Sequence, residues 1–236
     1  MIRSSKRSFV SRSLLVGAVM VATFAAPAFA DDRDATGFSG EATAVDVLVE
    51  NPLGGAALVD LVLGEAGPLP AAGGQDEETL VDVDEDVAEL LSLTASLITA
   101  ETEGSGSTAE SSATIADLAL NIMGDPLGLT EDLIDVSSTT LESNAVAECH
   151  ADGAAVSGDS VIEDLSINGT DITVTGEPNQ EVVLLEGLIE IVINEQIKDV
   201  ADDGTFGEIT VNALRITVFD PLAEDEVLAE IILASS

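Results

Sequence analysis

The sequence predicts an all-β fold, an antiparallel β-sandwich or meander of long strands, with an N-terminal signal-peptide helix outside it. Asn168-Gly169 lies between two runs in which apolar and polar residues alternate, and this dipeptide tolerates the positive φ angles of a type I′ turn. A turn there sets Ile167 opposite Thr170 and Leu165 opposite Ile172. Two further observations support the same class: a repeated segment with strand periodicity, and Gly, Pro and Asp clusters that divide the chain into short alternating segments.

Residues 1–30 are predicted to be an export signal. A basic segment (Arg3 to Arg12) precedes the apolar run Leu14 to Ala26, and Ala28-Phe29-Ala30 forms a cleavage site that leaves Asp31 as the mature N-terminus. The segment 5–10 resembles a weakened twin-arginine signal, but ordinary secretion is favoured because Lys replaces the first Arg. No later segment approaches the roughly 18 apolar residues of a membrane span, and the chain ends without a hydrophobic tail. We therefore expect one soluble, secreted β domain over residues 31–236.

The first half of this domain is predicted to begin with a hairpin. Phe38 to Glu50 and Ala57 to Leu63 alternate as two strands around a turn rich in Asn, Pro and Gly. Gly64 to Gly74 forms a long turn, and Asp76 to Asp86 is an acidic run. The spacing of apolar residues in Val87 to Ile98 suits either a strand or a short helix.

An internal repeat follows. Ile115-Ala-Asp117-Leu118-Ala-Leu120-Asn121 recurs as Ile162-Glu-Asp164-Leu165-Ser-Ile167-Asn168, with a weaker echo at Val211-Asn-Ala213-Leu214-Arg-Ile216. Each copy places apolar residues two apart, the period of a strand with one buried face. Repetition at this distance could indicate a solenoid, but two and a half unequal copies favour repeated hairpins in one antiparallel sheet system.

The remaining strands are predicted from alternation and turn residues. Leu133 to Ala147 supplies one or two strands, and Glu181 to Leu185 begins the third strand of the meander that starts at the Asn-Gly turn. Leu188 to Ile193 continues that sheet. Ile209 to Val218 is a long strand, and Val227 to Leu233 closes the domain.

The mature chain is strongly acidic. All 45 Asp and Glu residues lie beyond residue 30, but only three of the 7 basic residues do (Arg33, Lys198 and Arg215), which gives a net charge of −42. This charge disfavours binding to nucleic acid and to anionic membranes. It also opposes compaction unless salt or bound cations screen it. A merely soluble acidic exterior is the favoured explanation; adaptation to high salt and a surface that collects divalent cations are the alternatives.

Several short motifs, taken in order, resemble the choice-of-anchor P family of exported bacterial proteins. These motifs are Ala35-Thr36-Gly37-Phe38-Ser39-Gly40, Val156-Ser157-Gly158, Ile167-Asn168-Gly169, Thr175-Gly176-Glu177-Pro178-Asn179-Gln180, Ile193-Asn194-Glu195-Gln196 and Ile209-Thr210-Val211-Asn212-Ala213-Leu214. The resemblance covers nearly all of the mature chain. It implies an extracytoplasmic, mostly β domain and no established activity. This chain departs from the family by lacking a C-terminal anchor and by the acidic insert around Asp82 to Asp86.

Residue types that build common catalytic sites are scarce. Cys149 and His150 are the only Cys and His, and adjacent strand residues point to opposite faces, so they form no dyad and are too few for a standard zinc site. We expect Cys149 to be a small buried residue, with an intermolecular disulfide as the alternative, and His150 to lie in a solvated turn. The mature chain has no Trp or Tyr, so platforms for stacking sugar rings are nearly absent.

Calcium is the one site chemistry that the sequence suggests. The candidate ligands are Asp82, Asp84 and Asp86, and, beside Gly204, Asp199, Asp202 and Asp203. Ca²⁺ takes about six to eight oxygen ligands, which acidic loops supply. The first run opens like an EF-hand loop, but Val87 and Leu93 stand where the Gly and the bidentate Glu are required. A solvated run of charge is the competing explanation.

Together these features predict a secreted, highly acidic structural or interaction protein of the cell surface or extracellular matrix, without a catalytic site or required cofactor. Its expected partner is a surface or matrix polymer, or a second copy of itself. A calcium-dependent extracellular binding module is the first alternative. A polysaccharide-directed hydrolase with paired carboxylates is the second, although 45 acids place some pair at any distance by chance.

Overall fold

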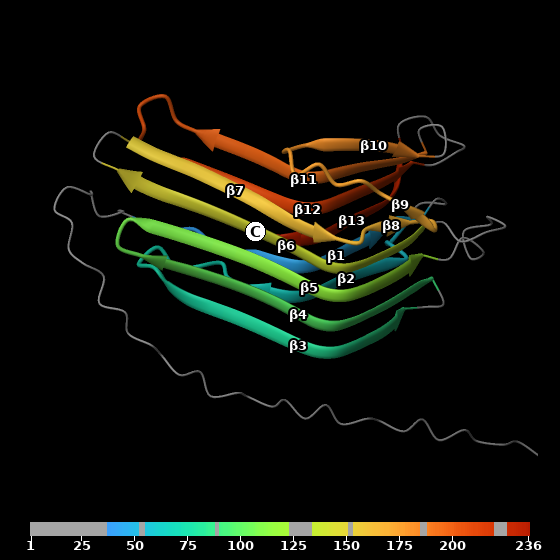
Figure 1. The fold of residues 1–236 in the computed structure, drawn as a ribbon. Coiled ribbons are helices and arrows are strands. Elements are labelled where there is room, and N and C mark those ends of the chain that lie inside the picture. The colour runs from blue at the N-terminus through green and yellow to red at the C-terminus, as the bar shows by residue number, and fades with distance from the viewer. Residues whose placement is uncertain are drawn as a thin grey trace, which may run out of the picture. The chain divides into compact units, whose positions relative to one another are not determined.

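The prediction of an all-β, antiparallel fold is confirmed. The computed structural model describes residues 37–51, 55–87, 90–122, 134–150, 153–184, 188–219 and 226–236. These residues form thirteen β-strands in two antiparallel sheets (Figure 1), and Asp31–Ser236 is one compact unit. Within the described ranges there is no helix long and apolar enough to cross a membrane.

The six-stranded sheet has the strand order β10-β11-β12-β13-β1-β2. Its strands are β10 Gln180–Leu184, β11 Ile189–Val200, β12 Gly207–Phe219, β13 Val227–Ser235, β1 Ala42–Val49 and β2 Val59–Ala66. The hairpin predicted near the N-terminus is β1-β2, with Val49 paired to Val59. The closing strand β13 lies between β12 and β1, so it joins the last part of the chain to the first.

The seven-stranded sheet has the order β3-β4-β5-β6-β8-β9, and β7 also pairs with β6. Its strands are β3 Gly74–Val87, β4 Leu91–Ser105, β5 Thr108–Ile122, β6 Ile134–His150, β7 Gly153–Glu163, β8 Ser166–Ile167 and β9 Thr170–Asp171. The acidic run Asp76 to Asp86 lies in the edge strand β3. Of the ambiguous segment Val87 to Ile98, Val87 ends β3 and residues 91–98 are strand β4, whereas residues 88–89 lie outside the described residues. Of the segment Leu133 to Ala147, residues 134–147 fall in the single strand β6, and Leu133 lies outside the described residues.

The Asn168-Gly169 turn is confirmed, but the meander built on it is wrong. Both residues have positive φ, 50° and 69°, and Ile167 pairs with Thr170 as predicted. The hairpin is only two residues deep. The segment expected as its third strand, β10, instead pairs with β11 in the other sheet. Ile172 and Val174 pack against the core between the sheets, so this alternating stretch serves to carry the chain from one sheet to the other.

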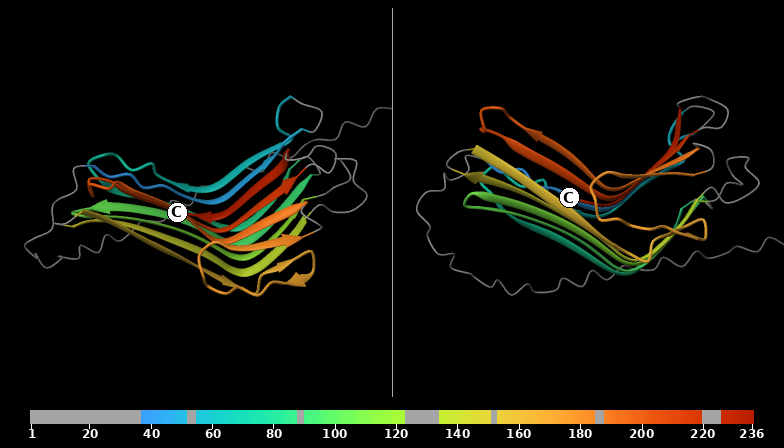
Figure 2. Two further views of the ribbon diagram at one scale, coloured as in Figure 1. Left: turned by 90° about the horizontal axis from the view of Figure 1, so that it is seen from above. Right: turned by 45° about the horizontal axis from the view of Figure 1, so that its top comes forward.

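Both sheets bend along one row of residues that crosses their strands, which we call the crease (Figure 2). Its members are Asp82, Ser96, Asp117, Thr139 and Asp164 in the seven-stranded sheet, and Asn194, Ala213, Ala234, Ala44 and Gly64 in the six-stranded sheet. The pairing ladder is interrupted there, and the register on the two sides is the same. On alternate strands the crease residue has a φ between 50° and 65°. Most of these residues are Asp, Asn or Gly, the types that adopt this conformation most readily.

The crease shifts the alternation of inward and outward side chains. In the seven-stranded sheet the inward residues on its two sides are three apart, as in Ile115 and Leu118; in the six-stranded sheet two consecutive residues, Ala44 and Val45, point inward. These two shifts in alternation are opposite because both sheets bend in the same direction. The side that faces the core is the inside of the bend in the seven-stranded sheet and the outside of the bend in the six-stranded sheet. Crease side chains of the six-stranded sheet therefore face the core, whereas those of the seven-stranded sheet face solvent.

The internal repeat is explained by this bend. Its three copies place Asp117, Asp164 and Ala213 at the crease of β5, of the β7–β8 edge and of β12. Neighbouring hydroxyls support the two acids: Ser96 Oγ donates to Asp117 Oδ2 at 2.8 Å, and Thr139 Oγ1 lies 3.2 Å from Asp164 Oδ2. The repeat marks a bend that recurs in each strand, as expected for hairpins in a sheet system.

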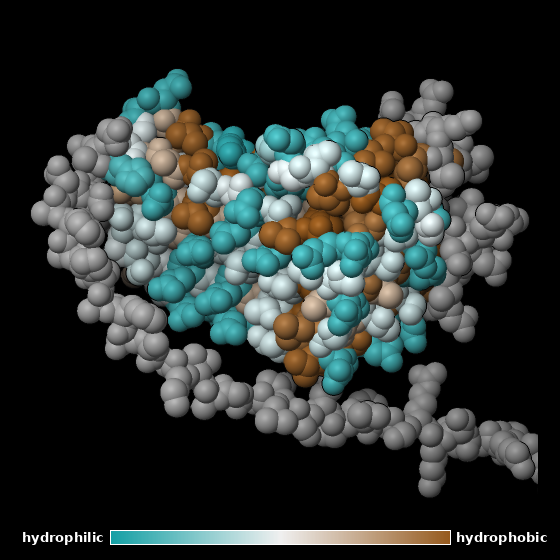
Figure 3. Space-filling model, in the orientation of Figure 1, coloured by the Kyte–Doolittle hydropathy of each residue, from teal (hydrophilic) through white to brown (hydrophobic). Residues whose placement is uncertain are grey.

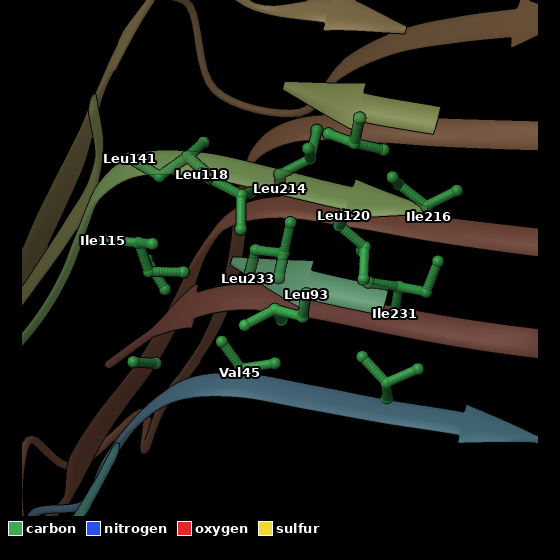
Figure 4. Packing of buried hydrophobic residues seen from close by; sticks show 14 of the residues in the cluster. Val45, Leu93, Ile115, Leu118, Leu120, Leu141, Leu214, Ile216, Ile231 and Leu233 are labelled. Carbon is green, nitrogen blue, oxygen red and sulfur yellow. The ribbon is translucent and has the colours of Figure 1, made fainter. Parts of the chain in front are cut away.

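The main core lies between the two sheets. Figure 4 shows Val45, Leu214, Ile216, Ile231 and Leu233 of one sheet packed against side chains of the other, Leu93, Ile115, Leu118, Leu120 and Leu141. A smaller cluster lies apart from it and consists of Ala145, Ile209 and Val211 with Val156.

The acidic edge strand β3 blocks one side of the sandwich. Glu78 Oε2 accepts a hydrogen bond from Glu65 N at 2.9 Å, and Asp76 Oδ2 accepts one from Gly67 N at 2.9 Å. Charge along an edge opposes pairing with another sheet. On the outer face of the seven-stranded sheet, hydrophilic and hydrophobic side chains are intermixed (Figure 3), with Val81 and Val161 among the exposed apolar residues.

Candidate functional site

The predicted calcium ligands are exposed, and their two groups lie on separate elements. Asp82, Asp84 and Asp86 are on β3, Asp199 is near the end of β11, and Asp202 and Asp203 are in the turn that follows it. Within the part of the chain that the structure describes, no group of three or more acidic, His or Cys side chains is placed to hold a metal ion. Thr205 donates to Asp203 Oδ1 from both its backbone N and its hydroxyl, and these bonds lower the pKa of Asp203. Calcium binding stays a prediction.

Cys149 and His150 are at the end of β6 and not in a turn as expected for His150. His150 Nε2 lies 3.6 Å from Glu148 Oε2 on an exposed surface. Cys149 is a free thiol and only half-buried, because it borders the cavity described below.

The outer face of the six-stranded sheet lies inside the bend, and we call it the concave face (Figure 2). Strand register arranges it in three lateral rows. The first contains Glu190, Thr217, Glu230, Leu48 and Asp60; the second contains Val192, Arg215, Ile232, Asp46 and Val62; the third, beyond the crease, contains Glu195, Asn212, Ser235, Thr43 and Glu65. These rows hold six carboxylates and one guanidinium.

A polar cluster at the crease joins the second and third rows. Arg215 Nη1 lies 3.1 Å from Glu195 Oε1, and Asn212 Nδ2 donates to Glu195 Oε2 at 2.7 Å. Although these residues face away from the other sheet, Glu195 and Asn212 are only 9% and 4% exposed. Among the described residues, Arg215 Nε and Asn212 Oδ1 have no hydrogen-bond partner. The base of the concave face therefore holds one donor and one acceptor that the described part of the chain does not satisfy, and such buried atoms are costly.

Asp46 is the carboxylate of the concave face whose pKa is raised. Burial raises its pKa, and the nearby carboxylate of Asp60 raises it further. Like charges that share a partly desolvated site disfavour ionisation. The pair therefore marks a part of the concave face at which a positive charge would be stabilising.

A cavity of about 540 Å³ opens through the six-stranded sheet between β12 and β1. The two strands are separated by β13 as far as the pairs Asn212–Ser235 and Thr43–Ser235. Past Ser236, residues 37–43 and 205–210 line opposite sides of the cavity. Its floor is the inner face of the other sheet, formed by Ser107, Ala109 and Ser111 of β5 and its turn and by Ala145, Ala147 and Cys149 of β6.

Two buried polar side chains, Ser111 and Ser236, border this cavity. The Ser111 hydroxyl lies 2.8 Å from that of Thr102. Ser236 is 7% exposed, and its Oγ has no hydrogen-bond partner among the described residues. Its backbone is held by Val211, with the two N–H···O bonds at 2.8 and 2.9 Å. The cavity thus has a fixed wall, a floor of small side chains and an unsatisfied hydroxyl.

Sequence reasoning missed both surfaces. Each depends on the pairing of β13 with β1, which are far apart in sequence, and this pairing brings β1 and β12 to either side of β13. One local signal was present: apolar residues three apart around an Asp, as in Ile115-Ala-Asp117-Leu118, break the alternation of a flat strand. That signal indicates a bend, although not which strands line it.

No protein-family model, no curated protein and no solved structure matches this chain.

Proposed function

We propose that this is a secreted, highly acidic structural or interaction protein of the cell surface or extracellular matrix, and that its concave face binds a cationic partner. The resemblance to the choice-of-anchor P family supports the extracytoplasmic location. The observation that carries the binding proposal is the concave face itself, where six carboxylates share one guanidinium in three adjacent rows.

Three properties of this face favour a cationic partner. The bend surrounds the carboxylates on two sides, and a cleft lined by one sign of charge concentrates the field and raises the rate of encounter with the opposite charge. Arg215 is already engaged by Glu195, so within the described part of the chain the other five carboxylates have no cationic partner. Leu48, Val62 and Ile232 lie between the acids and add apolar contact area to the charge attraction.

A matched pair of double variants tests the proposal. Asp60→Lys with Glu230→Lys reverses two charges of the concave face, whereas Glu110→Lys with Asp159→Lys makes the same change in net charge on exposed positions of the seven-stranded sheet. The concave-face variant should lose at least about tenfold in affinity for immobilised poly-lysine at physiological salt. It should also move the exported protein from the cell fraction to the medium.

The control variant should retain most of both properties. Equal losses in the two variants would show that net charge alone matters and would overturn the assignment to the concave face. Release of the unaltered protein into the medium, with no cell- or matrix-bound fraction, would overturn the surface role.

A further inference from the structure

The first row of the concave face carries its acids at regular intervals. Successive strands of the sheet contribute Glu190 of β11, Thr217 of β12, Glu230 of β13, Leu48 of β1 and Asp60 of β2. Every second strand therefore presents a carboxylate. Because adjacent strands lie about 4.8 Å apart, the three acids recur at intervals of about 9.6 Å. Among the described residues, none of the three has an ion-pair partner.

This row runs along the bend of the sheet. The rows and the crease all follow lateral strand pairs, so they are parallel to one another, and the strands rise on both sides of the crease (Figure 2). An elongated partner that lies inside the bend therefore follows the rows and meets Glu190, Glu230 and Asp60 one after another. To pair with all three, it must present a positive charge on one side about every 9.6 Å.

Polyproline II is the regular peptide conformation that meets this requirement. It has three residues per turn and rises about 3.1 Å per residue, so every third side chain points the same way, about 9.3 Å apart. Side chains on one face of a β-strand recur at about 6.6 or 13 Å, and those on one face of an α-helix recur after seven residues, about 10.5 Å. Over the two intervals from Glu190 to Asp60, polyproline II departs from the acids by about 0.6 Å and the helix by about 1.8 Å.

The base of the concave face offers hydrogen bonds that suit a peptide backbone. Asn212 is only 4% exposed, and it faces this side because its neighbours Val211 and Ala213 are buried between the sheets. No described residue donates to Asn212 Oδ1 or accepts from Arg215 Nε. Polyproline II has no internal hydrogen bonds, so its N–H and C=O groups can pair with both atoms. A simple polyamine has no carbonyl and would leave Arg215 Nε unpaired.

We propose that the concave face binds a polyproline II segment of a partner protein in which Lys or Arg recurs at every third position. This inference rests on the function proposed above and specifies its cationic partner. The backbone lies over the second row, and basic side chains extend about 6.6 Å, the distance between rows, to Glu190, Glu230 and Asp60. The partly exposed Arg215 side chain turns toward the backbone, which uncovers the two buried atoms of Arg215 and Asn212.

A second copy of the chain does not fit this description. Beyond residue 30 the sequence has only three basic residues, Arg33, Lys198 and Arg215, and no two of them are three positions apart. Two mature copies with 45 acids each also repel one another. The partner is therefore a different, basic protein.

The first test compares three synthetic peptides on the mature chain. A threefold repeat of Lys-Pro-Pro carries its charges at the proposed interval, whereas Lys-Lys-Lys-Pro-Pro-Pro-Pro-Pro-Pro has the same composition with the charges in a block. Calorimetry at physiological salt should give the periodic peptide about tenfold higher affinity, because only its charges meet all three acids. A threefold repeat of Lys-Gly-Gly keeps the spacing but is flexible, so its affinity should also be about tenfold lower than that of the proline repeat.

A matched pair of exchange variants locates the peptide. Glu230 and Leu48 are directly paired, so Glu230→Leu with Leu48→Glu moves the middle acid by one strand and leaves the composition unchanged. Glu110→Val with Val146→Glu makes the same kind of exchange between paired residues of the seven-stranded sheet. The first variant should bind the periodic and block peptides about equally, and the second should keep the preference. In the unaltered chain, the NMR signal of Arg215 Nε–H should shift when the periodic peptide binds.

Contrary outcomes are distinct. Equal affinities for the periodic and block peptides would overturn this inference, whereas the function proposed above would still stand if poly-lysine binding depends on Asp60 and Glu230. Equal affinities for the proline and glycine repeats would refute the polyproline II conformation. A preference that survives the exchange of Glu230 and Leu48 would place the peptide elsewhere, and an unshifted Arg215 Nε–H signal would refute the backbone contact. The peptide comparison on the unaltered chain decides the proposal even if the exchange variant fails to fold.

Discussion

Replacing Gly64 by Ala tests the nested packing at the crease. Gly64 has a φ of 65°, and a Cβ there would lie 2.6 Å from Ile98 Cγ2 of the other sheet and 3.1 Å from Ala44 Cβ. Two costs add. A left-handed conformation costs an L-residue about 1–2 kcal/mol, and overpacking a filled core costs about 1–3 kcal/mol. We expect Gly64→Ala to lower the free energy of unfolding by about 2–5 kcal/mol, a large part of the stability of a domain.

Gly106→Ala is the matched control. Gly106 has a φ of 60° in the turn between β4 and β5, and a Cβ there would meet nothing within 4 Å. It therefore carries the conformational cost and not the overlap, and both variants gain the same reduction in unfolded-chain entropy. Urea unfolding of the two proteins should show Gly64→Ala to be the less stable by about 1–3 kcal/mol. Equal stabilities would refute the close approach of the two sheets at the crease.

Four further predictions concern charge and processing. Burial, and then the carboxylate of Asp60, raise the pKa of Asp46, so the folded state keeps a proton that the unfolded state loses. The free energy of unfolding therefore falls as the pH rises from the ordinary pKa of 3.8 through the folded pKa, and this loss of stability remains at neutral pH. Asp46→Asn should thus raise the Tm at pH 7 but not at pH 3, and an equal gain at both would contradict the shift. The Tm of the unaltered protein should rise from low salt to molar NaCl, because three cations cannot pair 45 acids. At matched ionic strength, CaCl₂ should raise the Tm further if the predicted calcium ligands form a site, because a hundredfold excess of Ca²⁺ over Kd adds about 2.7 kcal/mol to the free energy of unfolding. Identical melting curves in the two salts would remove that site. Mass spectrometry of the exported protein should find Asp31 at its N-terminus, and an intact Met1 would contradict the predicted cleavage.

Local signals in the sequence determined the class of the fold and several of its strands. Period-two alternation predicted β1, β2, β12 and β13, since side chains of a strand point alternately to the core and to solvent. Asn168-Gly169 predicted its turn because these residues tolerate positive φ. The charge expected for the mature chain also follows from composition alone, and a charge of this size disfavours anionic partners.

Which strands become neighbours was decided only by the tertiary structure. The alternating stretch after Asn168-Gly169 predicted a meander, but burying Ile172 and Val174 between the sheets carries the chain across to the other one. Likewise, the acidic run of β3 showed no alternation strong enough to predict a strand, and its pairing with β4 makes it one.

The same is true of the two candidate surfaces. The concave face exists because positive-φ residues on alternate strands fall in register, and register between strands as distant as β1 and β13 is not encoded in any local segment. The cavity exists because β13 separates β12 from β1 along only part of their length. Alternation determines which face of a strand is buried. Only the packing of distant strands decides what that face, or a gap beside it, is placed against.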